Sequence, residues 1–138
     1  MEKYFIKEDI KTFYVAATSF PAGVLQAHQA LHALLPSTKD RKFFGISFPD
    51  KSGNIIYRAA VEESFDGEGK QFHCKTFIIR KGAYISATIK DFMADVSMVA
   101  KTFQQLLTHH DLDQNGYCLE IYPNEKDMLC LVKLNADD

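Results

Sequence analysis

The sequence predicts an α+β fold built from duplicated strand–helix–strand–strand modules. The chain has 138 residues, 46% of them hydrophobic, which is enough to form one globular domain with its own core. Two segments carry apolar residues at the spacing of a helix, and the segments around them are rich in β-branched and aromatic residues. Because this order of elements occurs in both halves of the chain, we expect an internal repeat.

The first half of the chain, about residues 12–65, contains one predicted helix between strands. Pro21 suits the first turn of this helix and Pro36 ends it, because proline cannot donate the hydrogen bond that a helix interior requires. The apolar stripe of the helix comprises Val24, Ala27, Leu31, Leu34 and Leu35. Strands are expected at 12–20, at 43–49 and from 55 onward, the last two joined by a turn.

The second half, about residues 72–134, has the same order of elements after the polar segment 65–70. A strand is predicted over 71–80 and continues past Lys81-Gly82 into 83–89. Asp91 is a candidate cap for the longest predicted helix. Its apolar stripe comprises Phe92, Val96, Val99, Phe103, Leu106 and Leu107. Two further strands are expected at 117–122 and 128–134, and residues 136–138 are expected to fray.

A short sequence match gives a register for the repeat. A shift of 74 residues places Phe48-Pro49-Asp50 on Tyr122-Pro123-Asn124, and it places Ile46 on Glu120. Under this register the second half has a carboxylate where the first half has isoleucine. We therefore expect Ile46 and Glu120 to be related by the internal symmetry.

Glu120 is the candidate functional residue because of its place in the strand 117–122. Side chains alternate between the two faces of a strand, so Cys118, Glu120 and Tyr122 share one face. A carboxylate in apolar surroundings is costly unless it is paired, protonated or used in function. The alternative is a glutamate on the solvated face of a half-exposed sheet.

Composition excludes several classes of partner. The formal net charge is −2, and the basic residues are dispersed, so we expect no nucleic-acid binding by the chain itself. No apolar run approaches the ~20 residues of a membrane span, so we expect no membrane contact. The charged N-terminus lacks the apolar core of a signal peptide, and the three cysteines lack paired spacing, which together favour a cytoplasmic location.

The remaining motifs do not indicate a metal or cofactor. Residues 111–116 fit the first half of a calcium loop, but Tyr122 occupies the position that requires a bidentate glutamate. His28 and His32 have the spacing of zinc ligands, but the glutamate of that helical motif and a third ligand are missing. We therefore expect no metal site and no cofactor.

Five segments, taken in order, resemble a known family. They are SFPAG, FFGISFP, IIYRAAVEE, RKGAYISATIKD and GYCLEIYPNEKD, the last followed by MLCLVKL. Together they resemble the GyrI-like small-molecule-binding domains, which are related to the effector-binding domains of bacterial multidrug-responsive transcription regulators. The resemblance implies a single stand-alone domain over residues 1–138, with a curved antiparallel sheet, two flanking helices and a ligand cleft between the modules.

The resemblance also implies which residues bind the ligand. The Glu-x-Tyr sequence at Glu120 resembles the cleft glutamate motif of the family, whose clefts are lined with aromatic residues. Since the chain has no tryptophan, tyrosine and phenylalanine must form these walls. An ionised carboxylate among aromatic rings favours a lipophilic cation. The expected ligand-binding residues are Glu120, Tyr122, Tyr57, Tyr84, Phe44, Phe48 and Ile46.

Two other functions remain open from the sequence. Some stand-alone members of the family resemble hydrolases of strained cyclopropane-type toxins, in which Glu120 would serve as acid or base with Tyr84 as its hydrogen-bond partner. The third reading is a regulatory module that binds a protein partner or forms a homodimer. One glutamate and several tyrosines suit ligand binding and acid–base chemistry alike, so the sequence does not decide whether the protein is an enzyme.

Overall fold

The computed structural model describes residues 1–135, and the chain divides into two compact units. The contiguous unit comprises Asp9–Ile79, and the split unit combines Met1–Glu8 with the chain from Arg80 onward. Each unit has a four-stranded antiparallel sheet and one long helix, which confirms the predicted α+β class. The expectation for residues 136–138 lies outside the described residues.

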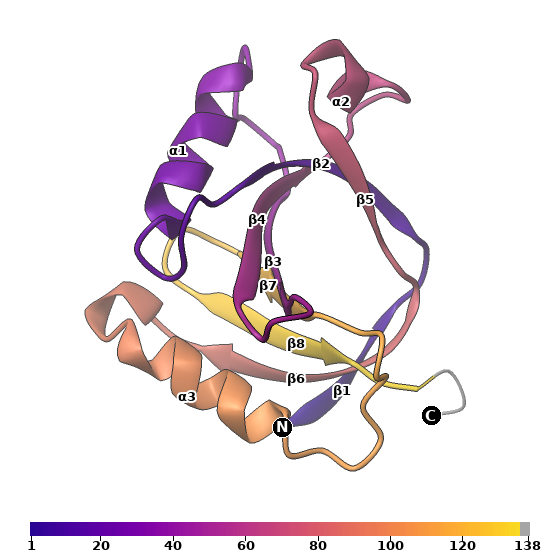
Figure 1. Ribbon diagram of the computed structural model, residues 1–138, viewed down its shortest axis with the longest axis vertical. Coiled ribbons are helices and arrows are strands. Elements are labelled where there is room, and N and C mark those ends of the chain that lie inside the picture. The colour runs from indigo at the N-terminus through magenta and orange to yellow at the C-terminus, as the bar shows by residue number, and fades with distance from the viewer. Residues whose placement is uncertain (136–138) are drawn as a thin grey trace. The chain divides into compact units, whose positions relative to one another are not determined.

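The contiguous unit has strand order β3-β4-β2-β5. The long helix α1 contacts β4 and β2, and the short helix α2 contacts β2 and β5 (Figure 1). Its elements, in chain order, are β2 (Ile10–Ala16), α1 (Val24–Leu34), β3 (Phe43–Pro49), β4 (Ile55–Glu62), α2 (Glu68–Gln71) and β5 (Lys75–Ile79).

The split unit has strand order β1-β6-β8-β7, and its long helix α3 contacts β6 and β8 (Figure 1). Its elements are β1 (Glu2–Ile6), β6 (Gly82–Ile89), a 3-10 turn (Phe92–Ala94), α3 (Ser97–Leu106), β7 (Cys118–Ile121) and β8 (Met128–Lys133). Each unit therefore contains a strand–helix–strand–strand module and one additional edge strand, β5 in the contiguous unit and β1 in the split unit.

The strand β1 and the helix α2 were not expected from the sequence. Ile6 is the buried residue of β1, while the other four side chains are exposed, so the strand has no apolar face to mark it. It is held by backbone pairing to β6, from Glu2 opposite Ser86 to Ile6 opposite Gly82. The helix α2 is a single turn of four residues, too short to show a periodic pattern.

The expected start of the long second helix was wrong. Asp91 has a positive φ of 49° and makes no side-chain capping bond. The helix α3 instead begins at Ser97, whose backbone N–H and hydroxyl donate hydrogen bonds to the carboxylate of Asp95, at 3.2 and 2.5 Å. Phe92 therefore lies in the preceding 3-10 turn and Val96 is 60% exposed, while Leu106 belongs to the buried face of α3.

The hairpin registers correct the shift that relates the two modules. In β3 and β4, Ser47 pairs with Tyr57, and in β7 and β8, Glu120 pairs with Cys130. Both members of these pairs differ by 73 positions (120 − 47 and 130 − 57). The predicted shift of 74 is therefore wrong by one residue, and in a strand one residue exchanges the two faces. Ser47, rather than Ile46, corresponds to Glu120.

A buried ion pair holds α2 in the contiguous unit. Arg41 donates two hydrogen bonds to the carboxylate of Glu68, at 2.8 and 3.1 Å, and a third to the carbonyl of Glu62 at 3.0 Å. The side chain of Glu68 is 5% exposed. Burial acts to raise the pKa of Glu68, but hydrogen bonds from Arg41 and the N–H of Ser64 outweigh burial and hold the pKa below its ordinary value.

We predict that Glu68→Gln lowers the free energy of unfolding at neutral pH by about 3 kcal/mol, because it leaves the Arg41 charge buried without a carboxylate. Because the folded-state pKa is lowered, this stability is present above the ordinary carboxyl pKa and is lost as pH falls through the folded value. Urea unfolding between pH 7 and pH 3 measures both effects. The exposed control Glu125→Gln should change stability by less than about 0.5 kcal/mol; equal effects of the two variants would contradict the prediction.

Candidate functional site

Glu120 lies on the face of the split unit that carries α3. It is opposite Cys130 on β8, and Cys130 is opposite Ala87 on β6, so the three side chains project from the same face. Cys130 belongs to the buried cluster that includes Leu106 of α3. Glu120 is 9% exposed. The carboxylate is thus in the sheet–helix core, and the reading of a solvated glutamate is excluded.

Tyr122 is the hydrogen-bond partner of this carboxylate. Its hydroxyl donates to Oε1 of Glu120 at 2.6 Å, a short bond of the kind that forms between a phenol and a charged oxygen. The two residues are two positions apart, so the alternation of the strand places them side by side on one face. The Tyr122 ring lies 5.9 Å from the ring of Phe92, inclined at 47°. The arrangement joins a carboxylate, a phenol and an aromatic wall.

The pKa of the neighbouring Cys130 thiol shows how apolar the surroundings of Glu120 are. Burial raises the pKa of Cys130 to about 12, with further contributions from the negative charge of Glu120 and from Cys118. Cys130 is fully buried and stays protonated at neutral pH, so it is not a nucleophile. A carboxylate in the same environment interacts strongly with any charge brought close to it, because little water screens it.

Tyr84 does not lie with Glu120, which corrects the sequence-based pairing of the two. It is opposite Lys133 on β8 and three positions from Ala87, so it projects from the other face of the sheet. Its hydroxyl donates to the carbonyl of Arg80 at 2.6 Å and shares a hydrogen bond of 2.6 Å with the hydroxyl of Tyr117. Tyr122 holds the place beside Glu120 that the sequence analysis assigned to Tyr84.

Tyr57 belongs to an aromatic group on the α1 face of the contiguous unit. Its hydroxyl shares a 2.8 Å hydrogen bond with Nε2 of His28 on α1. The ring of Phe20 stacks on it at 6.0 Å, and the ring of His28 meets it edge-on at 5.8 Å. The sequence analysis considered His28 only as a possible zinc ligand and missed its contact with Tyr57. The sequence signal for this contact was a polar side chain, the His28 imidazole, on the face of the helix that packs against the sheet.

Phe44, Ile46 and Phe48 lie on the opposite face of the same sheet from Tyr57. They alternate with Ser47, the cross-strand partner of Tyr57, and Ile46 is opposite Arg58. The guanidinium of Arg58 lies 4.7 Å from the ring centroid of Phe48 and 4.4 Å from that of Tyr14. The seven expected site residues are therefore divided between two faces in each unit, with Glu120 and Tyr122 in direct contact.

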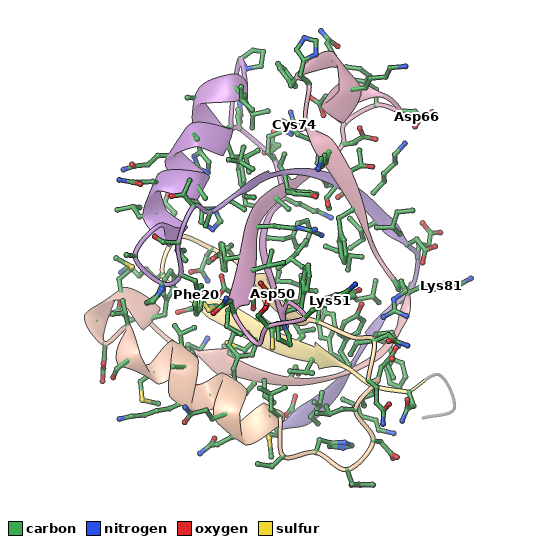
Figure 2. All side chains as sticks on the ribbon, viewed as in Figure 1. Phe20, Asp50, Lys51, Asp66, Cys74 and Lys81 are labelled. Atoms are coloured by element: carbon green, nitrogen blue, oxygen red, sulfur yellow. The ribbon has the colours of Figure 1, made fainter. Side chains whose placement is uncertain are left out.

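None of the expected site residues lines either of two surface hollows in the described chain. The larger, about 820 Å³, belongs to the contiguous unit near α2, where Asp66 and Cys74 are labelled in Figure 2. The smaller, about 360 Å³, belongs to the split unit. Within residues 1–135, no group of three or more potential ligand side chains is placed to hold a metal ion. No helix in that range has the length and hydropathy needed to cross a bilayer.

Comparison of the sequence with known proteins gives no assignment: no protein-family model matches it, and no curated protein is significantly similar.

Solved structures share the fold. An integron cassette protein from Vibrio cholerae has a TM-score of 0.70 at 9% identity, covering 97% of this chain and 95% of that one. SAV2435 bound to tetraphenylphosphonium has a TM-score of 0.63 at 11% identity, covering 98% and 94%. A hydrolase from Listeria innocua has a TM-score of 0.61 at 13% identity, covering 97% and 90%. At these identities the likeness defines the fold of the chain.

We predict that His28 makes stability depend on pH. Burial, with a contribution from His32, lowers the pKa of His28 to about 4 from an ordinary 6.5. The unfolded chain therefore binds the proton first, and stability falls as pH drops from 6.5 towards 4, by about 3 kcal/mol in total. Denaturant unfolding at pH 7 and pH 4.5 should show a smaller loss for His28→Gln than for the parent chain. The control is His110→Gln, whose side chain is 84% exposed; an equal reduction in both variants would argue against His28.

Proposed function

We propose that the chain is a GyrI-like small-molecule-binding protein whose ligand contacts are centred on Glu120 and Tyr122. The observation that carries the proposal is a carboxylate 9% exposed, on the helix-bearing face of a sheet, with a phenol bonded to it at 2.6 Å. Burying a carboxylate among apolar groups costs folding free energy. A bound ligand of opposite charge offsets this cost.

The ligand class is a lipophilic organic cation. A delocalised positive charge gains from the carboxylate of Glu120, and its apolar body gains from the ring faces of Tyr122 and Phe92. The likeness in fold to SAV2435, which was solved with tetraphenylphosphonium, supports this choice. Tyr57, with Phe20 and His28 around it, is proposed as a further aromatic contact for the ligand.

The second candidate is hydrolysis of a small electrophile, and the Tyr122–Glu120 hydrogen bond favours it. A phenol and a carboxylate in contact form an acid–base pair that can give a proton to a leaving atom or take one from attacking water. The fold is similar to that of the hydrolase from Listeria innocua. Tyr122 replaces Tyr84 as the proposed hydrogen-bond partner in this chemistry.

We predict that Glu120→Gln weakens binding of tetraphenylphosphonium by about 1–3 kcal/mol, or roughly 5- to 150-fold in Kd, because the amide keeps the size of the side chain but removes its charge. Stability should hold or rise, since a buried amide costs less than a buried carboxylate. Isothermal titration calorimetry and thermal unfolding of the same samples measure the two effects. Glu125→Gln, which removes an exposed charge, is the matched control and should bind as the parent does.

Unchanged affinity in Glu120→Gln would move the ligand site away from this residue. Turnover assays with strained electrophiles separate the two candidate functions. A binding protein gives no product with the parent chain, whereas a hydrolase gives product that Glu120→Gln nearly abolishes, because an amide cannot carry the catalytic proton.

A further inference from the structure

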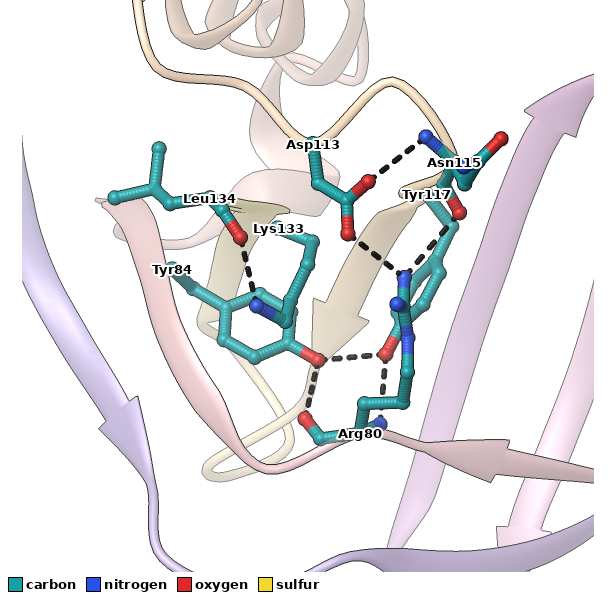
Figure 3. A network of polar contacts seen from close by, with 7 residues as sticks. All are labelled: Arg80, Tyr84, Asp113, Asn115, Tyr117, Lys133 and Leu134. Atoms are coloured by element: carbon teal, nitrogen blue, oxygen red, sulfur yellow. Dashed lines mark hydrogen bonds and ion pairs between the residues drawn. The ribbon is translucent and has the colours of Figure 1, made fainter. Parts of the chain in front are cut away.

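Lys133 is a buried lysine whose charge the fold does not match with a carboxylate of its own. It is 4% exposed, at the end of β8. Its Nζ donates a hydrogen bond of 2.7 Å to the carbonyl of Leu134 and lies 5.4 Å from the centre of the Tyr84 ring (Figure 3). An ammonium has three N–H donors. Within residues 1–135, the structure shows one hydrogen bond from the Lys133 ammonium, the bond to Leu134.

The acidic group that acts on Lys133, Asp113, is already engaged. Asp113 forms an ion pair with the guanidinium of Arg80 at 3.2 Å (Figure 3). Burial lowers the pKa of Lys133, and the positive charge of Arg80 lowers it further, while Asp113 acts in the opposite direction without offsetting them. The fold therefore penalises the charged form of Lys133. An anion beside the amine would reverse this penalty.

A surface hollow of about 360 Å³ opens beside this amine. Its lining residues are Ile6, Lys7, Lys81, Gly82 and Lys133, so three of the five are lysines. Gly82 has φ of +128°, and a Cβ there would lie 3.2 Å from Nζ of Lys133. The absence of a side chain at Gly82 leaves the amine uncovered on this side. Lys81, labelled in Figure 2, extends outward from the chain, and Lys7 is also exposed.

We propose that this hollow binds a small phosphate-bearing anion, with Lys133 as the buried contact and Lys7 and Lys81 at its rim. Three ammonium groups around a small volume favour a compact, multiply charged oxyanion, because each acts as a point charge with several donors. The volume is near the lower end of the range for small-molecule pockets, which suits a phosphate group or a small phosphorylated metabolite.

The anion site is independent of the site proposed around Glu120. Lys133 is opposite Tyr84, and Cys130 is opposite Glu120, so an odd number of positions separates the two residues of β8. They therefore project from opposite faces of the split unit's sheet. A ligand at Lys133 has the opposite charge to the cation proposed for Glu120. Failure of either proposal leaves the other in place.

The test uses inorganic phosphate as the probe. Amide signals of the intact chain are followed by two-dimensional NMR during titration, with ionic strength held constant by sodium chloride so that screening does not change. The expected result is a saturable shift of the amide signals of Gly82, Lys133 and Leu134. Acetate carries a single charge, so at equal ionic strength it should shift the same signals more weakly. Absence of a saturable phosphate shift, or equal shifts with acetate and chloride, would overturn the proposal.

The variant Lys133→Met tests the buried amine. Methionine keeps an unbranched apolar chain in place of the buried charge, a replacement that folded proteins tolerate. Phosphate affinity should fall by about tenfold or more, the loss expected for a charge-assisted contact. Lys101→Met removes an equal charge from an exposed position on α3 and should change phosphate affinity less than about twofold.

A second variant keeps the test decisive if Lys133→Met does not fold. The double substitution Lys7→Ala and Lys81→Ala removes the two rim charges from exposed positions and leaves the core intact. It should weaken phosphate binding while the thermal unfolding temperature stays close to that of the parent. If the double variant bound phosphate as tightly as the Lys101→Met control does, the phosphate would lie elsewhere and the proposal would be overturned.

Discussion

The cross-strand register of the split unit is the constraint on which its chemistry depends. Backbone pairing of β6, β8 and β7 fixes which side chains face α3 and which face away. Glu120 is on the first face and Lys133 on the second, and both are buried. A slip of one residue would exchange the two faces. Each of these charges would then project from the face opposite to its present one. The apolar residues that meet α3 therefore also determine where the charges lie.

The buried charges of the chain fall into two kinds. Arg41 and Glu68 satisfy each other through two hydrogen bonds, so this pair needs no further partner. Glu120 instead accepts a hydrogen bond from the phenol of Tyr122, and Lys133 donates one to the carbonyl of Leu134. A neutral phenol or carbonyl solvates a charge without cancelling it. This difference is the reason that we propose ligand contacts at Glu120 and Lys133 and none at the Arg41–Glu68 pair.

The sequence predicted the elements whose burial is regular. The faces of residues 117–122 followed from simple alternation, and the strands at 43–49 and from 55 onward were found because their side chains meet a core. The strand β1 escaped prediction because backbone pairing alone holds it. The start of α3 was misplaced because Phe92 is apolar, but it packs from a 3-10 turn rather than from the helix.

The site residues were harder to predict because they depend on contacts between segments that are distant in the sequence. Tyr122 could be paired with Glu120 from spacing, since it directly follows the strand β7 that holds Glu120. The partners of Tyr84 lie four and 33 positions away, and no local pattern indicates them. His28 and Tyr57 are 29 positions apart on a helix and a strand. No local pattern marks Lys133 as buried, because the groups beside its amine, the Tyr84 ring and the backbone at Gly82, come from β6, about 50 positions away in the sequence.

The position of the contiguous unit between β1 and β6 in the sequence has a consequence for the order in which the protein assembles as it leaves the ribosome. Asp9–Ile79 is continuous in sequence, whereas β1 must wait for β6, which is made more than 70 residues later. Ile10 pairs with Ile79, so closing the contiguous unit brings its two ends together. The chain next to β1 and the chain next to β6 are then held close together by the folded unit. Pairing of β1 with β6 therefore requires closure of only a short effective loop. The strand β1 is therefore made before the contiguous unit but pairs only after β6 has been made, and folding of the contiguous unit makes that pairing a local step.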